Sequence, residues 1–183
     1  MIRTTVPEPG VDSTTPVPPT PASWVPGTAA LNKDGTAAVR WVSCAAAGSC
    51  AAVGDYRDGS DHGQAFVVTK ANGRWRNAIQ VPGTGALNAG GVAGISSVSC
   101  ATAGSCTAGG FYRDGSGHIQ AFVVTKANGR WRKAIEVPGT AALNGYGLAE
   151  VNSVSCPAAG SCTAGGDYRD RHRHHQAFVV SKP

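Results

Sequence analysis

The chain has 183 residues, of which 42% are hydrophobic and 15% are charged, so it can bury a sizeable core as one domain or as a short array of repeats. Its formal net charge is +5, but the basic residues concentrate in two Arg-Trp-Arg segments and in residues 169–175, which form neither a helix face nor a base-stacking platform. Nucleic acid is therefore not an expected partner. No apolar run approaches the length of a membrane span, so this segment is not expected to insert into a membrane.

Residues 1–23 are rich in Pro and Thr and contain few groups that a core could bury, which predicts an extended linker or stalk. They also lack the apolar centre of an export signal, so any signal or anchor is expected outside this segment. In residues 24–183 Gly is frequent, Leu is rare, and no stretch places apolar residues at helical spacing. We therefore predict an all-β domain over residues 24–183.

Three short motifs recur with a step of 56 residues. They are Val-Ser-Cys ending at Cys44, Cys100 and Cys156, Gln-Ala-Phe-Val-Val from Gln64, Gln120 and Gln176, and Val-Pro-Gly-Thr from Val25, Val81 and Val137. Between residues 57–88 and 113–144, 27 of 32 aligned positions are identical, so identity alone cannot mark a functional residue. The motifs define repeat units at about 41–96, 97–152 and 153–183.

The six cysteines form three pairs with one spacing, and five residues lie between the members of each pair. Zinc knuckles usually place two to four residues between paired ligands, so disulfides in an oxidising compartment are the better interpretation, with reduced structural thiols as the alternative. No metal or other cofactor is expected. We predict the disulfides Cys44–Cys50, Cys100–Cys106 and Cys156–Cys162, and an extracellular or cell-surface location.

Each unit is predicted to form four antiparallel strands. In the second unit, one strand ends at Cys100, a second covers residues 106–112, and the loop 113–118 leads to a third over 120–126. The apolar run of the third strand does not alternate, which indicates that both of its faces are covered. Asn128-Gly129 then predicts a tight hairpin to a fourth strand over 131–137.

Four-stranded antiparallel units stacked face on face are the blades of a β-propeller. The segment Ala108-Gly109-Gly110 with Tyr112 and Trp131 resembles the kelch blade, and the turn over 125–131 resembles a degenerate Asp-box. The whole unit resembles the Cys-containing repeats of actinobacterial extracellular proteins, some of which accompany receptor-like serine/threonine kinases. This resemblance covers residues 24–183 and implies three β-propeller blades in the chain. A β-trefoil is the alternative, although trefoil units usually run shorter.

The third unit stops before a Trp-containing fourth strand, and residues 19–25 align with the missing piece. These residues are therefore expected to complete the last blade. Three blades are too few to close a propeller, so we expect the chain to associate with itself, as a homodimer with six blades or a homotrimer with nine. A stable monomer would instead favour the trefoil.

A Tyr-Arg-Asp segment, followed by a histidine four residues after the aspartate, recurs in every unit. Aromatic rings stack on sugar faces, and Arg and Asp bind pairs of hydroxyl groups, which predicts a carbohydrate site on one rim of the propeller. The alternative is an Asp-Gly turn with a surface Arg-Asp pair. The candidate ligand-binding residues are Tyr56, Arg57, Asp58, His62, Tyr112, Arg113, Asp114, His118, Tyr168, Arg169, Asp170 and His174.

These features predict an extracellular, lectin-like recognition module that binds a glycan at repeated sites. The alternatives are a protein- or peptide-binding sensor or scaffold domain of a receptor-like serine/threonine kinase, with a cell-surface protein as partner, and a purely structural repeat. The sequence has no nucleophile elbow, phosphate-binding glycine loop or helical His pair. Enzymatic activity and catalytic residues are therefore not expected.

Overall fold

The structure is a computed structural model that describes residues 21–182, so most of the predicted linker lies outside the described residues. Its regular structure consists of antiparallel strands and three one-turn helices, which confirms the all-β prediction. The strands form three separate sheets that follow the sequence repeats, and we call them sheets 1, 2 and 3. No helix in the described part of the chain is long and apolar enough to cross a membrane.

The structural units begin earlier than the predicted repeat units: each starts with a one-turn helix and continues through the strands of one sheet. The first unit contains α1 (Thr28–Leu31), β1 (Ala37–Ala46), β2 (Ser49–Arg57), β3 (Gly63–Ala71), β4 (Arg74–Trp75) and β5 (Ile79–Gln80). The second contains α2 (Thr84–Leu87), β6 (Ala93–Thr102), β7 (Ser105–Arg113), β8 (Ile119–Ala127), β9 (Arg130–Trp131) and β10 (Ile135–Glu136). The third contains α3 (Thr140–Leu143), β11 (Ala149–Ala158), β12 (Ser161–Arg169) and β13 (His175–Lys182).

The predicted hairpins form at the residues that the sequence marks for them. Asn128 and Gly129 have φ values of 52° and 77°, the left-handed pair that a two-residue hairpin turn requires, and the same turn recurs at Asn72 and Gly73. The three predicted disulfides are all present, each within the hairpin of the first two strands of its sheet. They are confirmed as intra-repeat links.

The fourth strand of sheet 2 is shorter than predicted. Instead of one strand over residues 131–137, β9 and β10 pair separately with β8. Between them, the backbone N–H of Ala134 leaves the sheet and donates to the carbonyl of Pro82 at 2.7 Å. Ala78 binds Pro26 in the same way in sheet 1. The outer strand is broken because its middle residue bonds to the Val-Pro-Gly-Thr segment instead.

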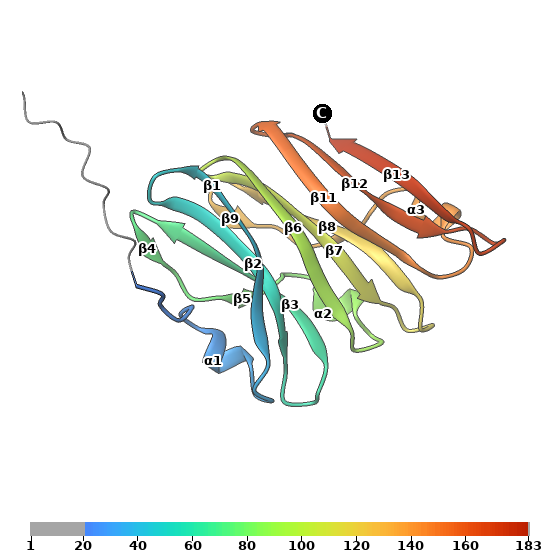
Figure 1. The fold of residues 1–183 in the computed structure, drawn as a ribbon, viewed down its shortest axis with the longest axis horizontal. Coiled ribbons are helices and arrows are strands. Elements are labelled where there is room, and N and C mark those ends of the chain that lie inside the picture. Colours follow the sequence, from blue (N-terminus) through green and yellow to red (C-terminus); the bar gives the residue numbers. More distant parts are fainter. Residues whose placement is uncertain (1–20, 183) are drawn as a thin grey trace, which may run out of the picture.

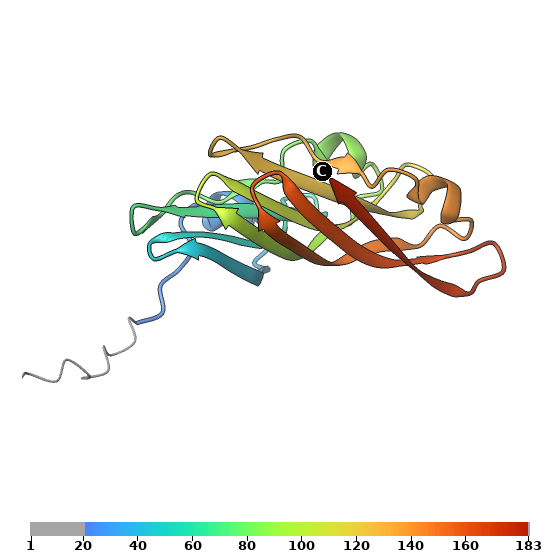
Figure 2. The same ribbon diagram turned by 90° about the horizontal axis from the view of Figure 1, so that it is seen from above.

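The three sheets stack face to face in a row (Figures 1 and 2). In sheet 1, Val53 and Val67 point toward sheet 2 and pack in one buried cluster with Ile95 and Val98. A second buried cluster joins sheet 2 to sheet 3. Both junctions use many of the same positions of the repeat, and sheet 2 is covered on both faces.

The first strands of the sheets, β1, β6 and β11, lie next to one another. Hydrogen bonds tie them together: the backbone N–H of Cys100 donates to Ser43 Oγ at 3.0 Å, and that of Cys156 donates to Ser99 Oγ at 3.1 Å. Among the described residues, backbone β-pairing between units is limited to two isolated bridges, Gly63–Val92 and Ile119–Leu148. That arrangement does not match the shared barrel of the trefoil alternative. It is an open row of repeated β units.

The predicted completion of the last unit by residues 19–25 is not formed within one chain. The outer edge of β13 has no strand partner among the described residues, since sheet 3 consists of β11, β12 and β13. The described residues of the segment lie beside sheet 1, at the opposite end of the row (Figure 1). There, Val25 packs with Ala52, Phe66 and Val68 of sheet 1, on the side of that sheet that faces away from sheet 2. Residues 19 and 20 lie outside the described residues.

Candidate functional site

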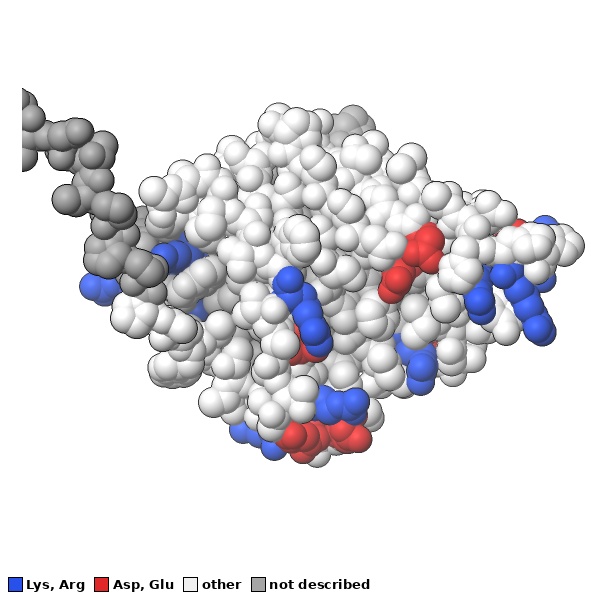
Figure 3. Space-filling model, in the orientation of Figure 1, with Lys and Arg blue, Asp and Glu red and all other residues white. Residues whose placement is uncertain are grey.

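The predicted site segments lie in the β2–β3, β7–β8 and β12–β13 connections, at one end of the sheets (Figure 1). Each segment is hydrogen-bonded to the chain between the one-turn helix and the first strand of its own sheet. The backbone N–H groups of that chain donate to the carbonyl oxygens of Arg57, Arg113 and Arg169. Figure 3 shows charged side chains gathered along this end, while the opposite part of the same view is almost uncharged. We call residues 57–62, 113–118 and 169–174 the loop rim.

The aspartate of each segment holds its loop in shape. Asp114 Oδ1 accepts the backbone N–H groups of Ser116 and His118, both at 2.9 Å, and Oδ2 accepts the side-chain amide of Gln120 at 3.2 Å. Burial opposes ionisation of Asp114, but these hydrogen bonds outweigh it, so its pKa is lowered. The carboxylate is therefore largely occupied in building the turn.

The other two loops repeat this turn. Asp58 accepts Ser60, His62 and Gln64, and its pKa is lowered by the same balance of burial against hydrogen bonds. Asp170 accepts the backbone N–H groups of the residues two and four positions later. These contacts match the aspartate turn that the sequence offers as an alternative to a ligand site, although Arg171 replaces the glycine in the third loop.

The tyrosines lie beneath the rim. The rings of Tyr56 and Tyr112 are buried, and burial raises the pKa of both phenols. The Tyr112 hydroxyl donates to a carboxylate oxygen of Glu136 at 3.0 Å, which anchors it within sheet 2. Tyr168 is half-buried against the core of sheet 3. The rings of Tyr56 and Tyr112 offer no free face on which a sugar could stack.

The histidines of the first two loops reach across to the next unit. A Cβ atom added at Gly91 would lie 2.7 Å from His62 Cδ2, and one added at Gly147 would lie 2.5 Å from His118 Cδ2. Only glycine fits beneath these rings, and both glycines also have positive φ. His62 and His118 therefore contribute to the packing between units, with one side of each ring left to solvent.

The loop of the third unit differs from the other two in charge and in its aromatic neighbour. Tyr146 is 43% exposed, and the guanidinium groups of Arg169 and Arg173 lie 5.3 and 5.1 Å from the centre of its ring. Both distances suit a cation–π contact. The equivalent position is Asp34 in the first unit and Gly90 in the second, so this exposed ring belongs to one loop alone.

An open cleft of about 690 Å³ lies between sheets 1 and 2, next to the loop rim. Trp41, which is 53% exposed, lines it together with the ring of Phe111. Beside them, Arg40 Nε and Nη2 contact the two carboxylate oxygens of Asp55 at 2.6 and 3.1 Å. Arg57 of the loop rim also lines the cleft. The cleft thus combines an accessible indole with an oriented guanidinium–carboxylate pair.

Trp41 and Arg40 escape a search for repeated motifs because they are not repeated. Trp41 stands where the other units have Ser97 and Ser153, and Arg40 stands where they have Ser96 and Asn152. Departure from an otherwise uniform repeat is the signal that could have pointed to them. Tyr146 departs from the repeat in the same way.

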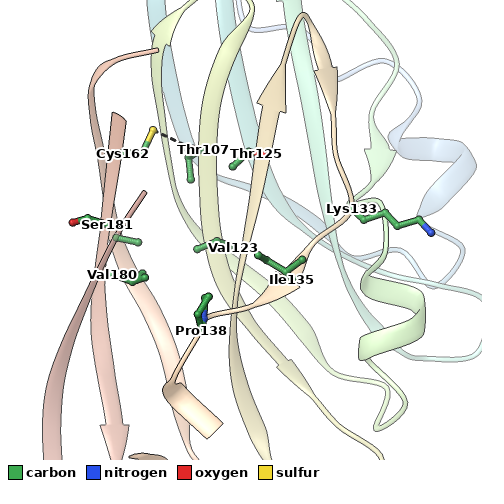
Figure 4. A pocket seen from close by; sticks show the side chains of 10 residues that line it. Thr107, Val123, Thr125, Lys133, Ile135, Pro138, Cys162, Val180 and Ser181 are labelled. Carbon is green, nitrogen blue, oxygen red and sulfur yellow. Dashed lines mark hydrogen bonds between the residues drawn. The ribbon is translucent and has the colours of Figure 1, made fainter. Parts of the chain in front are cut away.

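A smaller, mainly apolar cavity of about 260 Å³ lies between sheets 2 and 3. Figure 4 shows Val123 and Ile135 of sheet 2 facing Val180 of sheet 3, with a hydrogen bond between Thr107 and Cys162 at its edge. At the corresponding junction of sheets 1 and 2, Trp131 of β9 lies close by and donates its Nε1–H to Thr69. The corresponding junction also has a cleft, of about 510 Å³, and Trp131 forms part of its lining. Sheet 3 has no strand equivalent to β9 among the described residues, so the cavity between sheets 2 and 3 lacks such a tryptophan wall.

No protein-family model matches the chain, and no curated protein matches it either. The resemblance to extracellular Cys-containing repeats therefore remains a prediction. Over residues 21–182, no group of three or more His, Cys, Asp or Glu side chains is placed to hold a metal ion. The cleft and the loop rim are therefore the surfaces from which a function can be inferred.

Proposed function

We propose that the chain is an extracellular, lectin-like recognition module that binds a glycan in the cleft between sheets 1 and 2. The observation that carries this proposal is the exposed indole of Trp41 beside the Arg40–Asp55 pair. An indole stacks on the apolar face of a sugar, while a guanidinium and a carboxylate bind its hydroxyl groups in pairs. Three intrachain disulfides are typical of extracellular proteins and support the location.

The loop rim extends this proposed site. Arg57 belongs to both surfaces, so a glycan bound in the cleft reaches the rim without a gap. The exposed side chains of Arg113, His118 and His174 offer further donors to a long polysaccharide, and so does the half-buried Arg169. The buried tyrosines do not contact the ligand in this proposal, and the aspartates act by shaping the loops.

The test compares the wild-type protein with Trp41→Ser on a glycan array, followed by titration of the best-bound glycan. Serine is the residue that the other two units carry at this position, so the fold accommodates it. Loss of the stacking ring should weaken binding by about tenfold. Asn77→Lys is the matched control, because it also introduces the residue of the next unit, Lys133, at a position outside the cleft.

The control should bind as the wild-type protein does. If Trp41→Ser kept the wild-type affinity, the site would not be this cleft. If the wild-type protein bound no glycan at all, the lectin-like function would be rejected and a protein or peptide ligand would become the leading hypothesis.

A further inference from the structure

The two ends of the row expose surfaces whose equivalents are buried inside it. On β1, Val42 is 50% exposed, whereas the equivalent Val98 of β6 is 2% exposed because sheet 1 covers it. Val39 is likewise exposed on the same side of β1, and its equivalent Ile95 is buried. We call this side of sheet 1, defined by Val39 and Val42, the leading face.

At the other end, sheet 3 exposes the opposite side. Val179 of β13 is 79% exposed, whereas its equivalent Val67 in sheet 1 is completely buried beneath sheet 2. Ala177 is also exposed, although the equivalent Ala65 is fully buried. We call this side of sheet 3, defined by Ala177 and Val179 with Gly165 of β12, the trailing face. The two faces are the two halves of the junction that the chain already forms twice.

Their shapes match in the register of the interior junctions. At the junction of sheets 2 and 3, Val151 fills the space above Gly109, where an added Cβ would lie 2.5 Å from Val151 Cγ1. The repeat pairs Gly165 with Val39 in the same way. The space above Gly165 is open, since an added Cβ would have no atom closer than 3.7 Å.

The histidine–glycine contact gives a second match. His62 lies over Gly91 and His118 over Gly147, whereas a Cβ added at Gly35 would have no neighbour within 4 Å. By the repeat, the ring that belongs over Gly35 is that of His174, which is the most exposed of the three histidines. Gly35 keeps the positive φ of its equivalents, so the site for the ring is preformed.

Hydrogen bonds provide a third match. Ser43 Oγ binds the backbone N–H of Cys100, and Ser99 Oγ binds that of Cys156. The next pair in this series is Ser155 Oγ with the backbone N–H of Cys44. These two groups lie at opposite ends of the row and cannot meet within one chain (Figure 1).

From these matches we propose that the trailing face of one copy packs on the leading face of a second copy, in the register of the interior junctions. The occupant is another copy of this chain because the apolar pairs, the His–Gly contact and the serine hydrogen bond all continue the internal series. Such a head-to-tail contact is heterologous, and two copies that use it twice form a closed ring of six sheets with no exposed face. Residues 23–25 of the second copy then align with the missing outer strand of sheet 3, beside the open cavity of Figure 4.

The test uses light scattering on the 183-residue protein at micromolar concentration. We expect a mass of twice the 18.5 kDa chain. Val42→Asp places a charge in the apolar leading face, and Val179→Asp places one in the trailing face. Each variant alone should therefore be monomeric. Both side chains are exposed within one chain, so both variants should fold, which circular dichroism can check. Leu143→Asp, a change of the same kind at an exposed position on α3 away from both faces, should remain dimeric.

Mixing the two monomeric variants distinguishes this arrangement from any other dimer. The mixture retains one intact trailing face and one intact leading face, so a heterodimer should form, more weakly than the wild-type dimer because it has one junction instead of two. A dimer in which like faces meet would not be restored by mixing. A monomeric wild-type protein, dimers that survive either substitution, or a mixture that stays monomeric would each overturn the proposal.

Discussion

Within the repeated Tyr-Arg-Asp segment, the role of each residue depends on what its side chain contacts. The tyrosine ring packs beneath the rim, the aspartate binds backbone N–H groups, and only the arginine and histidine remain available to a ligand. The four residue types that together suggest a sugar site thus divide into two with structural roles and two that remain available to a ligand.

The burial of the tyrosines follows from strand alternation. Cys106, Ala108 and Tyr112 share one side of β7, and the first two are small apolar residues of the kind that line a core. The predicted strand over residues 106–112 already contains Tyr112, so following this alternation to the end of the strand would have predicted the burial of the ring. The aspartate turn was also available from the sequence, since Asp-Gly and a later Gln are present in two of the three units, but which oxygen binds which group depends on the folded loop.

The lowered pKa values of Asp58 and Asp114 predict acid sensitivity. A carboxyl group whose pKa is lower in the folded state stabilises the protein at pH values above its unfolded pKa of about 4, and this stabilisation is lost as the pH falls through the folded value. The free energy of unfolding should therefore decrease as the pH falls below about 4. Urea denaturation across this range measures it.

Asp114→Asn is the control for this prediction. The amide keeps one oxygen that can accept Ser116 and His118, but it does not titrate. The variant should be less stable than the wild-type protein at neutral pH and should lose less stability on acidification. Parallel curves for the two proteins would show that Asp114 does not contribute to the acid sensitivity.

The strands and turns follow closely from local sequence, and the departures have identifiable causes. Asn-Gly dipeptides place both hairpin turns, and the cysteine spacing places all three disulfides. The broken fourth strand was not predictable from its own residues, because the bond from Ala134 to Pro82 joins segments that are distant in sequence. The one-turn helices are too short to give a helical period, so the sequence predicted loops there.

The disulfide of sheet 2 should contribute measurably to stability. Linking Cys100 to Cys106 closes a short loop, for which the chain-entropy estimate is about 2 kcal/mol. Replacing both cysteines by alanine should lower the free energy of unfolding by about that amount in guanidinium denaturation. When this disulfide is reduced in the wild-type protein, its free energy of unfolding should approach that of the variant. An unchanged denaturation midpoint in the variant would mean that the hairpin is equally constrained without the link.

The arrangement of the sheets depends on contacts that no single repeat contains. The sequence shows that the units are alike, and from this follows that their junctions are alike, but it does not show which faces meet. The pairing of Gly109 with Val151, and of His118 with Gly147, appears only when two sheets are stacked. In such a row, stability is approximately a sum over units and junctions, so each end unit lacks the contribution of one junction.

Equivalent substitutions should therefore have unequal effects at the centre and at the end of the row. Val98→Ala opens a cavity in the junction between sheets 1 and 2 and should lower the free energy of unfolding by about 2 kcal/mol. Val42→Ala removes the same methyl groups from an exposed surface and should change it by less than about 0.5 kcal/mol when the protein is dilute enough to be monomeric. Thermal unfolding across a range of protein concentrations measures both.

At concentrations where copies pair, Val42→Ala should also lower the melting temperature, because it weakens the association that stabilises the folded state. If Val42→Ala lowered the melting temperature by the same amount at all concentrations, this side chain would belong to the core of one chain and not to its exposed end.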